Sequence, residues 1–307
     1  MKKRFFFLTL SLSAASAFAG TINGPAFKET TPSEPETASR IPFEFSAEYA
    51  YIADSTVSRG QRDVRDFDET YSFLEFVYTP RIKIGILRLG AAWERFSFGF
   101  PSGVQLEDTL QSVSAVVGFD TQFSDSILFR IEAQPGLYGT GDDLDSETFN
   151  VPFLVGGTYL YSSDLQFVLG ASVNFNRKFP VIPGGGVRWR AGSQWVVNAV
   201  LPTPRIEFEY SPTAMFYVGA NLKGSTFRVD QNFGTRQAGD FRLNNAWMDY
   251  TEVRVGLGTE IKLSPEVKLS FEGGYVPYRE FDYHRTPVRY HQEDGAAYGS
   301  IAFHAAF

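Results

Sequence analysis

The chain has 307 residues, of which 30 are Phe, 15 Tyr and 4 Trp, and it contains no cysteine. Missing cysteines exclude disulfide scaffolds, thiolate metal sites and cysteine nucleophiles, and a charged fraction of 21% is too high for a bundle of membrane helices. The net charge of -7 argues against a nucleic-acid partner, because phosphate binding needs a basic surface.

The first residues have the composition of a secretory signal peptide. Lys2, Lys3 and Arg4 precede an apolar stretch, and Ala17 and Ala19 supply a small-residue cleavage pattern. The alternative is a membrane anchor, but the apolar stretch is shorter than the roughly 20 residues that a spanning helix needs. We therefore expect a cleaved signal at residues 1–19. Residues 20–40 are rich in Thr, Ser, Pro and Glu without periodicity, which predicts a flexible periplasmic linker.

From residue 41 onward the hydrophobic pattern has a period of two, the repeat of a β-strand. It is clearest at residues 165–176, where apolar side chains alternate with polar or small ones. Several such stretches are longer than the usual 5 or 6 residues of globular strands, and this length suits a tilted strand that crosses a bilayer. The pattern predicts strands between an apolar and a polar environment.

Connections alternate between tight turns and longer polar loops, which is the asymmetry of an outer-membrane barrel. Long loops are expected at Asp54–Asp68, Pro101–Thr109, Gly139–Thr148, Asp230–Asn245 and Asp282–Gly295. We predict an all-β fold, a transmembrane antiparallel up-and-down β-barrel of about 14 strands over residues 41–307. If the segment Pro202–Pro204 is a bend inside one strand, the alternative is 12. The predicted strands are 41–53, 69–80, 85–98, 110–123, 126–138, 149–161, 165–176, 182–191, 194–201, 205–210, 215–229, 246–262, 267–281 and 296–307.

Aromatic residues lie on the apolar face and concentrate near the predicted strand ends. Tyr and Trp at these positions fit the two interfacial girdles of a membrane barrel. The alternative, a soluble β-sandwich with an aromatic core, explains neither the strand lengths nor the end of the chain. The girdle candidates are Tyr49, Tyr51, Trp93, Phe119, Tyr159, Tyr161, Trp189 and Trp195.

The opposite face of the predicted strands carries charges of both signs and would line a lumen. One interpretation is a selectivity lining for a polar solute, and the other is a salt-bridged network that fills a narrow barrel. The candidates for lumen-lining residues are Arg88, Glu94, Arg130, Glu132, Arg188, Arg190, Glu207, Glu252, Arg254 and Glu272.

The last residues carry a resemblance to a known class. Ala297, Gly299, Ile301 and Phe303 alternate with polar or small residues, and the chain stops at Phe307. This resembles the C-terminal strand of Gram-negative outer-membrane β-barrel proteins, and in particular their uncharacterised families. The resemblance implies that Phe307 is an assembly signal read by the barrel-assembly machinery. It also implies a location in the cell outer membrane, with outer-membrane lipids and lipopolysaccharide as partners.

Catalytic and metal signals are weak. Of three histidines, none forms an outward Ser/His pair of the kind that outer-membrane phospholipases use, and we expect no enzyme and no cofactor. Asp143, Asp145 and Glu147 offer alternating carboxylates that suit calcium, but the spacing of an EF-hand is missing and a solvated acidic loop explains them as well.

The sequence therefore predicts a porin-like channel or transport protein for small solutes. A structural or surface-binding barrel with a blocked lumen is the alternative, and a membrane-embedded lipid-modifying enzyme is a third. The solute and the oligomeric state stay open at this point.

Overall fold

The computed structural model describes residues 42–60, 62–102, 104, 106–141, 144–235 and 240–307. The predicted signal peptide and linker lie outside these residues. In the described part of the chain, no helix is long and apolar enough to span a membrane.

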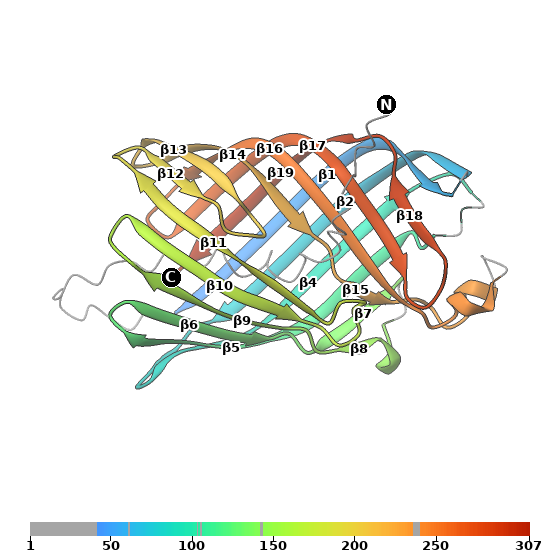
Figure 1. Cartoon of the computed structure of the whole chain (residues 1–307), viewed down its shortest axis with the longest axis horizontal. Helices are drawn as coiled ribbons and strands as arrows, with labels where there is room; N and C mark the ends of the chain where they lie inside the picture. Colours follow the sequence, from blue (N-terminus) through green and yellow to red (C-terminus); the bar gives the residue numbers. More distant parts are fainter. Residues whose placement is uncertain (1–41, 61, 103, 105, 142–143, 236–239) are drawn as a thin grey trace, which may run out of the picture.

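In the described residues, nineteen strand segments form one sheet, antiparallel except for a single bridge between β7 and β15, which closes on itself in a barrel of steeply tilted strands (Figure 1). The segments are β1 (Phe43–Arg59), β2 (Arg62–Tyr78), β3 (Arg81–Ile82), β4 (Gly85–Gly99), β5 (Thr109–Ser124), β6 (Ile127–Ala133), β7 (Gly136–Thr140), β8 (Phe149–Asn150), β9 (Phe153–Leu160), β10 (Leu165–Val173), β11 (Val181–Ala191), β12 (Trp195–Asn198), β13 (Arg205–Ser211), β14 (Ala214–Lys223), β15 (Thr226–Arg228), β16 (Trp247–Lys262), β17 (Val267–Tyr283), β18 (Arg289–Gln292) and β19 (Ala296–Ala306). Short 3-10 turns, η2 (Ser146–Thr148) and η4 (Phe241–Leu243), lie in two of the loops.

Within the described residues, these segments make a barrel of fourteen strands. The pairs β6/β7, β8/β9, β14/β15 and β18/β19 are each one interrupted strand, and β3 is a short extension beside β4. The ring closes where β1 pairs with β19 from Glu44 opposite Ala306 to Ile52 opposite Tyr298. The prediction of an all-β barrel with 14 strands is confirmed.

The segment at Pro202–Pro204 is the reversal of a hairpin, which decides between the two strand counts. The Leu201 amide donates to the carbonyl of Gly185 on β11, and the Leu222 amide on β14 donates to the carbonyl of Pro202. The two sides of this segment therefore pair with different neighbours, so β12 and β13 are separate strands.

The prediction of a long loop at Asp54–Asp68 is wrong, because β1 and β2 continue through this segment to a tight turn near Gly60. Register shifts between Ile52 and Ser55 and between Ser55 and Val57 explain why the period of two was lost there. A bulge inserts a residue into one strand, so the side chains beyond it change faces while the ladder continues.

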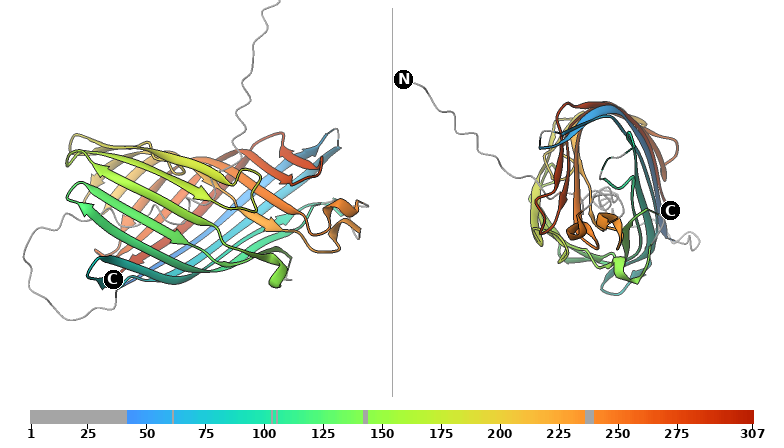
Figure 2. Two further views of the ribbon diagram at one scale, coloured as in Figure 1. Left: turned by 60° about the horizontal axis from the view of Figure 1, so that its bottom comes forward. Right: turned by 90° about the vertical axis from the view of Figure 1, so that its right-hand side faces the viewer.

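One end of the barrel carries tight turns together with Phe43 and Phe307, and we call it the periplasmic end, as in barrels of this class. The opposite, outer end carries the longer loops. Seen along its axis, the ring is oval (Figure 2). Outward side chains near mid-strand are apolar and exposed, with Leu169 at 75% and Leu257 at 70%. The buried hydrophobic cluster lies on the inward faces and in the outer half.

Candidate functional site

Opposite walls of the barrel meet at its outer end. Arg228 of β15 and Gly139 of β7 form a parallel bridge, although their strands lie six apart around the ring of fourteen described strands. Beside them, the Asp230 amide donates to the Thr140 hydroxyl oxygen at 3.1 Å. Strands six apart in such a ring are nearly diametrically opposed, so the two walls close together here. We call this contact the outer seam.

Below the outer seam, aromatic side chains from both walls pack against each other in the lumen. The ring of Phe96 on β4 lies 4.8 Å from that of Tyr250 on β16 and 6.2 Å from that of Phe227 on β15, measured between centroids. The Phe98 and Phe281 rings are 5.1 Å apart. We call this cluster the aromatic plug, and it consists of Phe67, Phe96, Phe98, Phe227, Tyr250 and Phe281, all buried.

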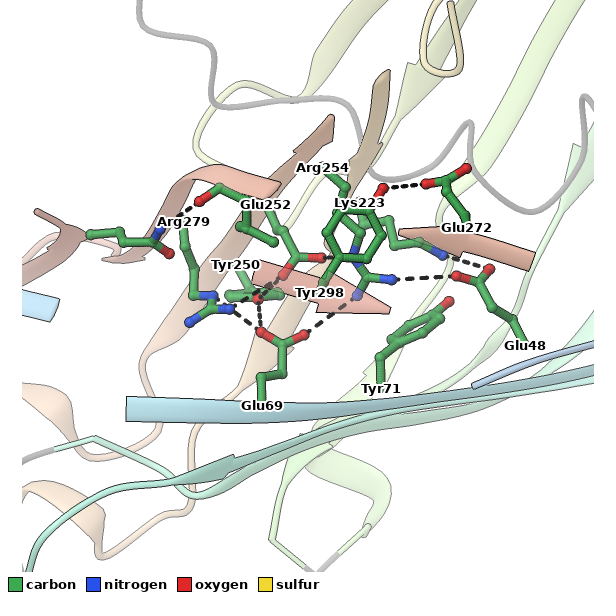
Figure 3. A network of polar contacts seen from close by, with 12 residues as sticks. Glu48, Glu69, Tyr71, Lys223, Tyr250, Glu252, Arg254, Glu272, Arg279 and Tyr298 are labelled. Carbon is green, nitrogen blue, oxygen red and sulfur yellow. Dashed lines mark hydrogen bonds and ion pairs between the residues drawn. The ribbon is translucent and has the colours of Figure 1, made fainter. Parts of the chain in front are cut away.

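Next to the aromatic plug, towards the periplasmic end, lies a layer of ionisable side chains. Figure 3 shows the contacts of this layer from close by. Arg254 bonds Glu252 at 2.6 Å, reaches Glu48 on β1 at 3.3 Å and lies 3.6 Å from Glu69 on β2. Lys223 on β14 bonds Glu48 at 2.8 Å. The contacts to Glu48 and Glu69 cross the lumen between strands that are not neighbours in the sheet. We call the group the ion layer, and it consists of Glu48, Glu69, Lys223, Glu252, Arg254 and Arg279.

Tyrosines connect the ion layer to its surroundings. The Tyr250 hydroxyl lies 2.7 Å from Glu69 and 3.2 Å from Glu252, so it has two carboxylate acceptors for one proton. The Lys223 ammonium lies 4.0 Å from the centroid of the Tyr71 ring, and the Arg254 guanidinium lies 4.9 Å from it. Cation–π contacts of this kind are stronger when they are desolvated.

The centre of the ion layer is desolvated and incompletely hydrogen-bonded, while Glu48 at its edge is 22% exposed. The side chains of Glu69, Glu252 and Arg279 have 0% exposure and that of Arg254 has 1%. Arg279 Nε lies 3.1 Å from Glu69, but none of its three guanidinium nitrogens has a hydrogen bond of good geometry among the described residues. Burial of such charges is costly even when they are paired.

Towards the periplasmic end, the lumen is lined by paired charges, some of them partly exposed and others, such as Arg88 and Glu132, buried. Arg190 pairs with Glu209 at 2.7 Å, with 40% and 34% of the two side chains exposed. Glu207 accepts from both Arg205 and Arg188, and Arg130 pairs with Asp120 at 2.6 Å. Arg88 lies between Glu44 and Glu132 at 2.9 and 3.0 Å.

The ten lumen candidates therefore fall into separate groups in the structure. Arg88, Arg130 and Glu132 lie on the β4 to β6 wall, and Arg188, Arg190 and Glu207 lie on the β11 to β13 wall. Glu252 and Arg254 belong to the ion layer. Glu94 accepts from Tyr71 at 3.1 Å, and Glu272 accepts from Tyr298, whose ring faces Arg254.

The sequence reasoning missed Glu69, Arg279 and Lys223. Glu69 is the first residue of the predicted strand 69–80, and Lys223 lies on the same inward face of β14 as Asn221. Alternation along the strands could therefore have identified both residues. Alternation gave no indication of Arg279, because β17 has one extra residue between Tyr275 and Tyr278, opposite Val253 and Val255, and this bulge reverses its parity. Simple alternation from Glu272 would have placed Arg279 outside the barrel.

The acidic loop has a structural use. Asp143 lies outside the described residues, and Asp145 caps η2 by accepting from the amides of Glu147 at 2.8 Å and Thr148 at 3.3 Å. Among the residues that are described, no group of three or more His, Asp or Glu side chains is placed to hold a metal ion.

A closed antiparallel sheet with an apolar outward face and a polar lumen defines an outer-membrane β-barrel. Residues 82–304 match the family described as "Domain of unknown function (DUF6268)", and the chain belongs to that family. No curated protein matches the chain.

Solved structures with a similar fold include outer-membrane channels and porins. The COG4313 outer membrane channel from Pseudomonas putida F1 is 8% identical, with a TM-score of 0.45 over 90% of this chain and 100% of that one. The P. putida toluene transporter TodX is 9% identical, with a TM-score of 0.41 over 88% and 91% of the two chains. The KdgM porin is 10% identical, with a TM-score of 0.33 over 85% and 99%.

Proposed function

We propose that this barrel is a gated channel for small solutes, and that the aromatic plug and the ion layer together form its gate. The observation that carries the proposal is the complete burial of Arg254 and Arg279 with Glu69 and Glu252 inside the lumen. Apolar side chains of similar volume would fill the same space at equal or lower cost. Charges held at such cost within a membrane protein are functional by default.

The two layers would resist solutes in different ways. The aromatic plug excludes water, and a hydrophobic constriction blocks ions by dewetting. The ion layer joins walls through long side chains, and Lys223 and Arg254 can change rotamer without moving a strand. Opening requires the wall that carries β15 to move away from β4 and β7. The partly exposed charges near the periplasmic end would then line the path.

The second candidate is a barrel whose lumen stays closed and whose outer loops contact a surface partner. The outer seam favours it, because a backbone bridge between Arg228 and Gly139 is a stronger closure than side chains alone. The two candidates differ in one measurable property, which is whether the barrel ever conducts.

Planar bilayers separate the two candidates. The wild-type barrel is expected to be closed most of the time, with brief openings. Glu69→Gln removes the carboxylate that Arg254 and Arg279 share, so we expect its open probability to rise roughly tenfold, which corresponds to about 1.4 kcal/mol. Glu209→Gln is the matched control, since Glu209 is half-exposed and pairs only with Arg190 among the described ion pairs.

Two results would overturn the gated channel. Silence from wild type and from Glu69→Gln alike would leave the permanently closed barrel as the better account. A wild type that is constantly open would show that the aromatic plug is not a gate.

A further inference from the structure

The loop between β10 and β11 folds inward and brings buried donors together. The Lys178 amide donates to Asp249 of β16 at 3.1 Å, and its ammonium bonds Asp282 at 2.6 Å. Met248 and Tyr250 belong to the buried cluster in the lumen, so Asp249 between them points to the other face of β16. The loop therefore lies between that face and the inward face of β8 to β10.

Arg177 of this loop is 5% exposed, and within the described residues its guanidinium makes one long hydrogen bond, of 3.4 Å, from Nη1 to the Ser172 hydroxyl oxygen. Among the ion pairs of the described residues, none involves Arg177. Asp249 is the carboxylate whose field reaches it. That carboxylate already accepts from the Thr226 hydroxyl at 2.7 Å, contacts His284 at 2.8 Å and accepts from the Lys178 amide.

Two buried asparagines beside Arg177 present unused amide donors. Asn176 donates from its side chain to the Asn150 oxygen at 2.9 Å and from its backbone to the Asn174 oxygen at 3.0 Å. These hydrogen bonds orient the side-chain amides of Asn150 and Asn174 so that the oxygen of each points towards Asn176. Nδ2 of Asn150 and Nδ2 of Asn174 therefore face away from it, and both are buried without a hydrogen bond within the described part of the chain.

The guanidinium of Arg177 thus has no carboxylate partner among the described ion pairs, and the two amide NH2 groups of Asn150 and Asn174 are buried without an acceptor in the described part of the chain. Buried donors are normally satisfied, and each unsatisfied one carries a desolvation cost. An oxyanion supplies several acceptors and one or two negative charges, and guanidinium binds such groups in a bidentate way. A cation or an apolar solute offers nothing to these donors.

We propose that Arg177, Asn150 and Asn174 form a binding site for a small oxyanion, a carboxylate, phosphate or sulfate group carried by a free solute. The site rests on the proposed channel in one respect, since it would give the channel a preference for anionic solutes. The anion would accept two bonds from the guanidinium of Arg177 and one from each asparagine Nδ2. Ser172, buried beneath the guanidinium, orients it.

The test uses the full chain, purified in detergent without lipopolysaccharide. Heat-modified gel migration gives the unfolding midpoint in sodium phosphate and in sodium chloride of equal ionic strength. A ligand that binds only the folded state raises this midpoint. We expect phosphate to raise it by a few degrees in wild type and in the control Arg190→Gln, and to have no specific effect on Arg177→Gln.

Further variants keep the proposal falsifiable if Arg177→Gln does not assemble. Arg177→Lys keeps the charge but loses the bidentate geometry, and Asn174→Leu removes one donor, so each should reduce the phosphate effect by roughly half or more. An equal phosphate effect in all variants would overturn the site, as would a wild type that does not distinguish phosphate from chloride. A response to added lipid A without a response to phosphate would overturn the assignment to a free solute.

The outcome is independent of conductance. A phosphate effect that needs Arg177 in a barrel that never conducts would support the site and contradict the channel. Conductance that shows no dependence on Arg177, together with no phosphate effect, would support the channel and contradict the site.

Discussion

Phe96 on β4 and Phe227 on β15 contact each other edge to face across the lumen, with ring centroids 6.2 Å apart. Their strands are six apart around the ring of described strands, so the contact joins nearly opposite walls. Aromatic pairs of this geometry contribute about 0.5–1.5 kcal/mol beyond their buried area. The outer half of this barrel is therefore packed like the interior of a soluble domain, whereas its outward face is apolar and exposed.

The ion layer should be sensitive to the loss of a single partner. Arg254→Leu leaves Glu252 and Glu69 with fewer counter-charges in a fully buried place, so we expect a loss of about 3–5 kcal/mol in the free energy of unfolding. Arg190→Leu removes a half-exposed pair and should cost no more than about 1 kcal/mol. Urea unfolding in detergent measures both. Equal losses would contradict the claim that the ion layer is desolvated.

The assignment of the outward face can be tested by placing a charge at Leu169, which is 75% exposed near the middle of β10. Leu169→Arg should cost about 2–4 kcal/mol, because an arginine at the bilayer midplane loses its hydration. Thr158→Arg, on the inward face of the neighbouring strand β9, should cost far less. The free energy of unfolding in lipid vesicles is the measurement. A larger cost for Thr158→Arg would reverse the assignment of the two faces.

Two glycines allow a matched test of packing inside and outside the barrel. A Cβ at Gly256 would collide with the Tyr298 hydroxyl oxygen and would lie 2.8 Å from the Gly273 carbonyl oxygen, whereas a Cβ at Gly299 would meet nothing within 4 Å. Gly256→Ala should therefore displace Tyr298 from Glu272 and cost about 1–3 kcal/mol. Gly299→Ala should be nearly neutral. Thermal midpoints in one detergent compare the two, and similar values would show that Tyr298 is not fixed.

The last residue lies at the closing pair of the barrel. The Phe307 amide donates to the Phe43 carbonyl oxygen at 2.9 Å, and the two rings are 4.6 Å apart between centroids. If Phe307 is the assembly signal, Phe307→Ala should lower the amount of assembled, heat-modifiable protein in outer membranes several-fold. Phe123→Ala, at another exposed phenylalanine near the periplasmic end, should leave it unchanged. Normal assembly of the Phe307 variant would contradict this role.

Alternation along the strands was enough to predict the barrel and much of its charged lining. The pleat fixes a period of two, so Arg88 and Glu132 could be placed on the inward face from sequence, and they pair at 3.0 Å. The strand count could be predicted from the turns, because the residues of a tight turn are selected by the local backbone conformation. The alternation along the strands and the positions of the turns both depend mainly on residues that are close in sequence.

The gate region was beyond that reasoning for two physical reasons. A bulge in β17 reverses the parity of that strand, which concealed Arg279 and the inward position of Phe281. The outer seam between Gly139 and Arg228 depends on how far the oval ring is flattened, and no local pattern records that. The orientation of Asn150 and Asn174 likewise depends on Asn176, a contact between separate strands.

The outer seam offers the most direct test of the claim that opposite walls close the lumen. Bridge partners in a sheet lie about 4.8 Å apart, within the range of disulfide geometry, and the chain has no native cysteine. Gly139→Cys with Arg228→Cys, in the Glu69→Gln background, should form a disulfide in isolated outer membranes under mild oxidation. The oxidised barrel should lose its openings in planar bilayers and regain them on reduction. Free thiols after oxidation, or openings that persist in the cross-linked barrel, would contradict the account.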